Sequence, residues 1–224
     1  MVGEPESLFS EESLQVRTER HDYDRLLMLS DGVFAIAITL LALDLRLPDR
    51  WDGSWNGLIG VTGRPLIGYL FGFGLVGVFW IAHRRLFARL QQVDHIITAL
   101  NLLLLGLVGL TPFIARMIAE AGPTRALPYY FIALASVLGS VVLIRTWAAM
   151  RPGLLHPEVD RGRWKLELLL AAIGVVALAA AGAVQIVEKK PMGTSAALAL
   201  VLVLAIGRGL YRRSTHQRSS TSRP

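Results

Sequence analysis

The chain of 224 residues contains no cysteine. A disulfide framework, a thiol nucleophile and a thiolate metal site are therefore excluded. Charge is also scarce, because charged residues make up 18% of the chain, against about 25% in soluble domains. Low charge combined with long apolar runs excludes a disordered chain, a collagen and a coiled coil. With 53% apolar residues, the chain is predicted to be an all-α membrane protein that crosses the bilayer several times.

Six apolar runs are long enough to span a bilayer, which takes about 20 residues per helix. They cover residues 26–47, 65–83, 96–119, 127–150, 166–187 and 192–207. The sequence thus predicts three parts: a cytoplasmic segment at 1–25, a transmembrane domain of six helices at 26–212, and a disordered basic cytoplasmic tail at 213–224. The first part carries several acids and lacks the apolar centre of a signal peptide.

The distribution of lysine and arginine predicts the orientation in the membrane. If the N-terminus is cytoplasmic, 16 of the 23 basic residues lie on the cytoplasmic side, in agreement with the positive-inside rule. Both termini are therefore expected in the cytoplasm, and the compartment is expected to be a cell membrane. The basic tail lacks the interleaved aromatic residues and the fold of a nucleic-acid-binding segment, so no nucleic-acid partner is expected.

The first apolar run contains an acidic residue near its start, in the sequence Ser30-Asp31-Gly32. An ionisable group at membrane depth is costly and is therefore a functional candidate. Two interpretations of Asp31 remain open at this point. Either it handles ions directly, or it lies near the interface and pairs with a neighbouring helix.

Aliphatic residues of the same run form a narrow stripe when they are placed at about 100° per residue on a helix. Asp31 lies about 140° from Ile36 on this wheel, so the stripe and the acid face different surroundings. The sequence alone does not decide whether the stripe faces a pore, lipid or other helices. Its members are Leu29, Gly32, Ile36, Leu40, Leu43 and Leu47.

Polar residues in the later runs have structural explanations as well as functional ones. His83 follows Trp80 near the end of the second run and is either an interfacial anchor or a partner of Asp31. Asn101 is placed for a hydrogen bond between helices, a contact of modest strength. These positions are therefore candidates for contacts that hold the helices together.

Charged residues near the ends of the runs are expected at the membrane interface. Arg116 and Arg145 lie where a long side chain reaches the headgroup region. Glu167 is expected to form an interfacial pair with Arg163 and Lys165, which precede it in the chain.

No catalytic or metal-binding motif stands out in the sequence. The chain lacks HExxH, GxSxG and Walker sequences, and it has no GxGxxG that opens a helix after a strand. Its five histidines are scattered mostly in the loops, whereas a metal site needs several of them to converge. The protein is therefore not expected to be an enzyme, and neither a cofactor nor a metal site is expected.

The start of the first run closely resembles the signature of the potassium channel family named after lysosomal transmembrane protein 175. That signature is Arg-x-x-x-Phe-Ser-Asp followed by an apolar run that contains isoleucine and threonine. The chain reads Arg25-x-x-x-Leu29-Ser30-Asp31 and continues as such a run to Leu41. Leu29 replaces the phenylalanine of the family, which changes one packing contact.

The resemblance implies an assembly and a pore. Prokaryotic members of the family are six-span units that form homotetramers, and the first helix of each subunit lines the central pore. The family lacks the TVGYG carbonyl filter, a sequence that is also absent here. Apolar side chains form the constriction instead. By position these are Ile36, Leu40 and Leu43, with Thr39 just beside the stripe.

The resemblance also implies a group of residues that anchors the pore helix to its neighbours. Arg25, Ser30 and Asp31 correspond to that network by their motif positions. Further candidate members on later helices are Trp80, His83 and Asn101.

The predicted function is a potassium-preferring cation channel with a hydrophobic constriction. A narrow apolar neck imposes a dehydration barrier, which favours weakly hydrated K⁺ over Na⁺. The alternative is a proton-coupled secondary transporter that uses Asp31 and His83. The expected partners are further copies of the chain, potassium ions and the lipid bilayer.

Overall fold

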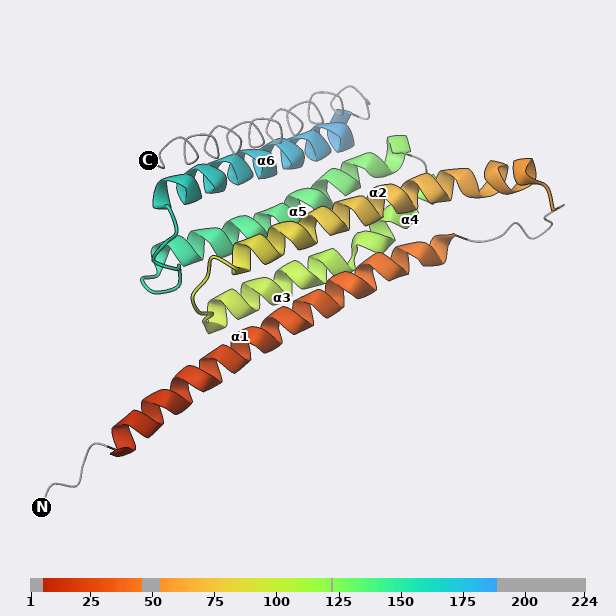
Figure 1. The fold of residues 1–224 in the computed structure, drawn as a ribbon. Coiled ribbons are helices and arrows are strands. Elements are labelled where there is room, and N and C mark those ends of the chain that lie inside the picture. The colour runs from red at the N-terminus through yellow and green to blue at the C-terminus, as the bar shows by residue number, and fades with distance from the viewer. Residues whose placement is uncertain (1–5, 46–52, 122, 189–224) are drawn as a thin grey trace, which may run out of the picture.

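The computed structural model describes residues 6–45, 53–121 and 123–188, and the descriptions below refer to these residues. They form a bundle of long helices without a sheet (Figure 1). The all-α prediction is confirmed for this part of the chain. The helices are α1 (Glu6–Leu40), the short 3₁₀ helix η1 (Leu41–Asp44), α2 (Trp55–Phe87), α3 (His95–Gly109), α4 (Thr111–Ala121), α5 (Pro123–Met150) and α6 (Arg161–Glu188).

Five segments of these helices are long and apolar enough to cross a membrane. They are His21–Leu43, Gly68–Phe87, His95–Ile118, Arg125–Met150 and Arg161–Val187. The first five predicted spans therefore each have a counterpart. The predicted sixth span at 192–207 and the predicted tail at 213–224 lie outside the described residues.

Two helices begin well before the apolar runs that predicted them. The first helix begins at Glu6, so it includes most of the predicted N-terminal segment. The second begins at Trp55, where the Ser54 side chain accepts a hydrogen bond from the backbone N–H of Gly57 at 3.0 Å. Such a cap satisfies one of the unpaired N–H groups at a helix start. Apolar length marks only the membrane-crossing part of a helix, so these extensions were not predicted.

The third predicted span is divided between two helices. Gly109 ends α3 and Thr111 begins α4, so the helix is interrupted at Leu110. Pro112 explains the interruption, because proline has no N–H to donate to the carbonyl of Val108 and its ring crowds that carbonyl. The Thr111 hydroxyl donates to the Val108 carbonyl instead, at 2.6 Å.

The five membrane segments alternate in direction along the chain, and α4 continues the direction of α3 (Figure 1). Figure 1 places the start of α1, the end of α2, the start of α3, the end of α5 and the start of α6 toward the same end of the bundle. That end is called the loop end below, because it carries the α2–α3 and α5–α6 loops. The beginning of α1 projects beyond the bundle at this end (Figure 1).

The bundle has α1 along one side, next to α2 and α3, and the α5–α6 pair on the other side (Figure 1). Gly182 allows α5 and α6 to approach closely, since a Cβ at this position would lie 2.8 Å from the carbonyl oxygen of Pro128 and from a side-chain carbon of Ile132. The core between the two sides is aromatic and aliphatic. Its members include Phe34, Leu86, Phe87, Ile144 and Trp164, each at most 1% exposed.

Candidate functional site

One face of the membrane-spanning part of α1 packs against the rest of the bundle. Its residues recur every three or four positions, which places them on one side of a helix. All are less than 10% exposed: Leu26, Ser30, Phe34, Ala37 and Leu41. This face fixes the rotation of α1 about its axis, and it therefore fixes where every other residue of the helix points.

A directed chain of hydrogen bonds crosses from α2 through α3 to α1. His83 Nε2 lies 2.9 Å from Asn101 Oδ1, and Asn101 Nδ2 donates to Ser30 Oγ at 2.9 Å. The Ser30 hydroxyl donates in turn to the carbonyl of Leu26 at 2.8 Å. His83, Asn101 and Ser30 are all buried. Because Asn101 Oδ1 accepts, this arrangement uses the His83 tautomer that carries its proton on Nε2.

The ring of His83 is held between two aromatic side chains. The ring centroid of Phe87 lies 4.4 Å away in a stacked arrangement, and that of Phe34 lies 5.5 Å away. His83 Nδ1 is buried and has no hydrogen-bond partner within the described residues. The imidazole thus bonds to Asn101 on one edge, stacks on Phe87 and lies beside the tilted ring of Phe34.

Asp31 makes a separate contact beside this series of hydrogen bonds. Its carboxylate accepts a hydrogen bond from the indole N–H of Trp80 at 2.7 Å. The guanidinium of Arg84 lies over the same indole, 4.9 Å from the ring centroid. Asp31 itself is exposed, whereas its neighbour Ser30 is fully buried. Asp31 and His83 therefore bind different partners, and the direct pair considered from the sequence does not form.

Arg25 and Tyr23 differ from expectation in opposite ways. Arg25 is exposed and takes no part in the series of hydrogen bonds from His83 to Leu26. Tyr23 was not singled out from the sequence, yet its hydroxyl donates to the carbonyl of Phe87 at 2.9 Å. It lies seven residues before Ser30, on the same face of α1. That spacing from the Ser-Asp pair is the only sequence signal that would have pointed to it.

The opposite face of α1 is aliphatic and uncovered in the single chain. The exposed fractions are 49% for Leu29, 59% for Ile36, 41% for Leu40 and 66% for Leu43. Thr39 is also exposed, and its hydroxyl is bonded within the helix to the carbonyl of Ile36 at 2.9 Å. These four aliphatic residues are called the α1 stripe below. Leu47 of the predicted stripe lies outside the described residues.

The end of the stripe follows a different helical geometry from the one assumed on the wheel. Residues Leu41–Asp44 form a 3₁₀ helix, in which side chains three residues apart are eclipsed. Leu43 therefore lies almost directly beyond Leu40, and the stripe continues across the change of helix type. Gly72 faces this turn, since a Cβ on it would lie 3.1 Å from the Leu41 side chain.

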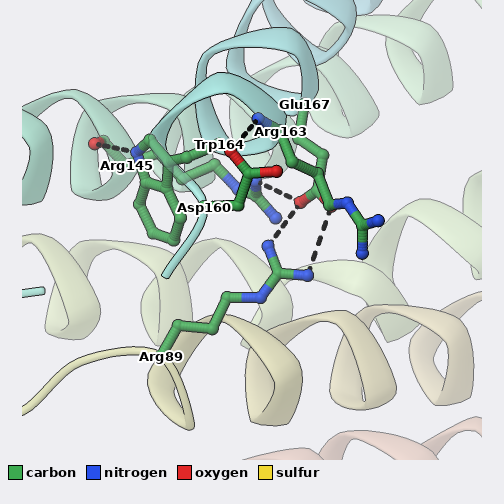
Figure 2. Close-up of polar contacts among 6 residues, drawn as sticks. All are labelled: Arg89, Arg145, Asp160, Arg163, Trp164 and Glu167. Atoms are coloured by element: carbon green, nitrogen blue, oxygen red, sulfur yellow. Dashed lines mark hydrogen bonds and ion pairs between the residues drawn. The ribbon is translucent and has the colours of Figure 1, made fainter. Parts of the chain in front are cut away.

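A second polar cluster lies at the loop end, away from α1. Figure 2 shows the Glu167 carboxylate between two guanidinium groups. Arg89 donates to it through both terminal nitrogens, at 2.7 and 3.2 Å, and Arg145 donates at 2.8 Å. This ion cluster joins α6 to α5 and to the loop after α2. The sequence predicted Arg163 and Lys165 as the partners of Glu167 and did not predict Arg89 or Arg145. Arg145 is buried rather than directed to the headgroups.

Backbone contacts reinforce the ion cluster. The α2–α3 and α5–α6 loops pair through two hydrogen bonds, from Gln91 N to Leu154 O at 2.8 Å and from His156 N to Arg89 O at 3.0 Å. Asp94 caps the start of α3 by accepting from Ile97 N at 2.7 Å. Together these contacts fasten the loop end of α2, α3, α5 and α6.

The fold and these contacts define a multi-pass helical membrane protein whose first helix is anchored on one face and aliphatic on the other. Residues 25–112 match the family described as "Endosomal/lysosomal potassium channel TMEM175". A potassium channel of Streptomyces collinus is 34% identical over 159 residues, which cover 67% of this chain and 76% of that protein. The chain belongs to the TMEM175 family, and the resemblance seen in the sequence is confirmed.

Other relatives carry two kinds of name. A potassium channel of Chamaesiphon minutus is 33% identical over 64% of this chain and 74% of its own length. A human protein named "Endosomal/lysosomal proton channel TMEM175" is 36% identical over 98 residues, or 40% of this chain and 19% of that protein. Both kinds of name describe ion channels.

A solved structure shares the fold. The crystal structure of a lysosomal potassium-selective channel TMEM175 homolog from Chamaesiphon minutus aligns with a TM-score of 0.66. The alignment covers 83% of this chain and 97% of that chain at 24% sequence identity. At this level of identity the likeness concerns the architecture of the helices.

Proposed function

We propose that the chain is one subunit of a potassium-preferring cation channel, in which the α1 stripes of four copies surround a central pore. Ile36, Leu40 and Leu43 form the constriction, and Thr39 lies at its edge. Ser30, Asp31, Trp80, His83 and Asn101 hold α1 at the rotation that turns the stripe toward the axis. Arg25 lies within the same anchored segment, between Tyr23 and Leu26.

The observation that carries this proposal is the contrast between the two faces of α1. Ser30 and Phe34 are buried against α2 and α3, whereas Ile36 and Leu43 have more than half of their surface exposed. A helix anchored in this way presents a fixed row of side chains to whatever lies outside the subunit. The names of the bacterial relatives, both potassium channels, support a pore there.

The dimensions of the stripe suit a hydrophobic constriction. Four residues of α-helix from Ile36 to Leu40 rise about 6 Å, and three residues of 3₁₀ helix to Leu43 rise about 6 Å more. Aliphatic side chains from four copies would enclose a neck about 12 Å long that offers no oxygen ligands. Such a neck gates by dewetting and selects by the cost of removing water from the ion. K⁺ holds its water less tightly than Na⁺ and crosses more easily.

The orientation proposed for the subunit places the loop end in the cytoplasm of a cell that carries the protein in its cell membrane. Segment 1–25 and the tail at 213–224 then lie on that side. The loop end contains most of the basic residues of the described loops, as expected for a cytoplasmic surface.

The alternative is a secondary transporter coupled to protons through Asp31 and His83. The human relative is named a proton channel, so proton movement is measured beside K⁺ movement. A transporter would give a flux that saturates with substrate concentration and depends on a proton gradient. A pore gives a current that reverses at the potential set by its permeant ions.

The experiment uses the purified chain in a planar bilayer with K⁺ on one side and Na⁺ on the other. The reversal potential is expected to show greater permeability to K⁺ than to Na⁺. Ile36→Asn is expected to hydrate the neck and to lower this preference. Val78→Asn is the matched control, because Val78 on α2 is 63% exposed and lies outside the α1 stripe. Equal permeability of the two ions in the wild type would overturn the proposal.

A further inference from the structure

The loop end carries three tryptophans, each with an arginine guanidinium over its ring. Arg84 lies 4.9 Å from the Trp80 centroid, Arg145 lies 5.2 Å from that of Trp164, and Arg151 lies 4.8 Å from that of Trp147. These pairs lie at the end of α2, the end of α5 and the start of α6, which Figure 1 places together. Tryptophan rings gather at the level of the lipid headgroups. Trp164 is buried in the core, so the partly exposed rings of Trp80 and Trp147 mark that level.

Positive charge is in excess at this end. Residues 84–95 and 145–167 contain eight arginines and lysines but only four acids. Three of the acids have partners within the protein: Glu167 binds two arginines, Asp94 caps α3 and binds Trp147, and Asp160 accepts from the N–H groups of Gly162 and Arg163. Glu158 is exposed. The exposed cations are Arg84, Arg85, Arg151, Arg161 and Lys165, and none of them has an ion pair within the described part of the chain.

Arg84 and Arg151 are distinctive within this group because of how they are held. Stacking on an indole occupies the face of a guanidinium and leaves the N–H groups along its edge free. The edge of Arg145 is bound by Glu167. The side chains of Arg84 and Arg151 make no hydrogen bond or ion pair within the described residues, although the Asp94 carboxylate lies near Arg151. A planar fork of N–H donors that is fixed in place binds two phosphate oxygens at once.

We propose that the loop end binds the headgroups of anionic phospholipids, with Arg84 on Trp80 and Arg151 on Trp147 as its phosphate-binding positions. The tryptophans set the depth, the stacked arginines bind the phosphate, and the other exposed cations attract negative charge to the same leaflet. This inference concerns lipid binding and does not depend on which ion the protein conducts.

The test measures lipid binding to the full chain in detergent by native mass spectrometry. Phosphatidylglycerol and phosphatidylcholine are titrated separately, and phosphatidylglycerol is expected to bind more tightly. Each basic residue near an anionic surface contributes about 1 kcal/mol, so Arg84→Gln and Arg151→Gln should each weaken phosphatidylglycerol binding roughly fivefold. Binding of phosphatidylcholine should change little, because its headgroup has no net charge.

Two further variants distinguish phosphate binding at Arg84 and Arg151 from general electrostatic attraction of anionic lipid to a basic surface. Arg125→Gln removes an exposed arginine at the start of α5, at the opposite end, and should leave phosphatidylglycerol binding unchanged. Arg84→Lys keeps the charge but loses the planar fork, and it should weaken binding by less than Arg84→Gln. Equal binding of the two lipids, an effect of Arg125→Gln as large as that of Arg84→Gln, or displacement of phosphatidylglycerol by an equal concentration of inorganic phosphate would overturn the proposal.

Discussion

The two sides of the bundle are fastened by different chemistry. On the α1 side, Tyr23 donates a hydrogen bond to α2, Ser30 accepts one from α3 and Asp31 accepts one from α2, and no ion pair is among these three contacts. On the α5–α6 side, Glu167 binds two arginines, and Gly182 brings the helix backbones into contact. The bonds of Tyr23 and Ser30 join neutral groups, and such bonds between helices in a membrane contribute about 1 kcal/mol each. Breaking a buried ion pair costs several times more.

The distribution of contacts along α1 adds to this difference. All three polar contacts involve residues of the first half of its membrane segment, at 23, 30 and 31. The segment with Ile36, Leu40 and Leu43 is held by apolar packing. The residues that pack are Phe34, Ala37 and Leu41, with the partly buried Val33 and Ile38. The α5–α6 side therefore acts as a fixed platform, and the α1 stripe is the part that small changes can move. Substitutions on the two sides should separate stability from conduction.

The largest effect is expected from Glu167→Gln. This change leaves Arg145, whose side chain is 8% exposed, without a counter-charge, and such a loss costs about 3–5 kcal/mol. Thermal unfolding in detergent measures the loss. Glu158→Gln removes an exposed carboxylate and is the control. If the two variants melt at the same temperature, the ion cluster does not stabilise the bundle.

Gly182→Ala is expected to destabilise the protein by about 1–3 kcal/mol, because the added methyl group overlaps the Pro128 carbonyl and Ile132. Gly106→Ala is the matched control, since a Cβ at that position meets nothing within 4 Å. Both variants should keep the ion preference of the wild type. A changed preference in Gly182→Ala would show that the two sides are not independent.

Asn101→Ala is expected to cost about 1–2 kcal/mol, because it leaves Ser30 and His83 without their shared partner. Unlike Gly182→Ala, it should also change the reversal potential, since it releases the anchored face of α1. Leu102→Ala, at a neighbouring position that is 50% exposed, serves as the control. An unchanged reversal potential in Asn101→Ala would mean that packing alone positions the stripe.

The smallest effect concerns pH and Asp94. Partial burial disfavours its charged form, but the Ile97 N–H, the Trp147 indole and the nearby His95 and Arg151 outweigh this and hold the pKa of the Asp94 carboxyl below its usual range. A lowered pKa contributes stability above the unfolded value near 4, which is lost as the pH falls through the folded value. Melting temperatures from pH 7 to pH 2 should therefore fall less in Asp94→Asn. Parallel curves for the two proteins would contradict the assignment.

Much of the fold follows from local sequence, and the exceptions have physical causes. Apolar runs predict where membrane segments lie, because the bilayer sets their length. They do not predict that α1 begins at Glu6 or α2 at Trp55, because the part of a helix outside the bilayer does not need an apolar run. The interruption at Leu110 follows from Pro112, whereas the apolar length of the run predicted a single uninterrupted span at 96–119.

The candidate site divides in the same way. The angular positions of Ile36, Leu40 and Leu43 follow from helical periodicity, and the structure leaves all three exposed. The partners of Glu167 do not follow from sequence, because Arg89 lies 78 residues away and its nearer neighbours Arg163 and Lys165 were the simpler choice. Contacts between distant segments depend on tertiary packing, which periodicity does not encode.

The most direct test of the central claim uses the absence of cysteine in the chain. Ile36→Cys and Val78→Cys each introduce a single thiol, at positions that are 59% and 63% exposed in one subunit. Silver ions, which are small cations that bind soft thiolate sulfur, are then applied during K⁺ current recording. If the α1 stripe lines the pore, Ile36→Cys is blocked and Val78→Cys continues to conduct. Block of Val78→Cys, with Ile36→Cys unaffected, would contradict the account.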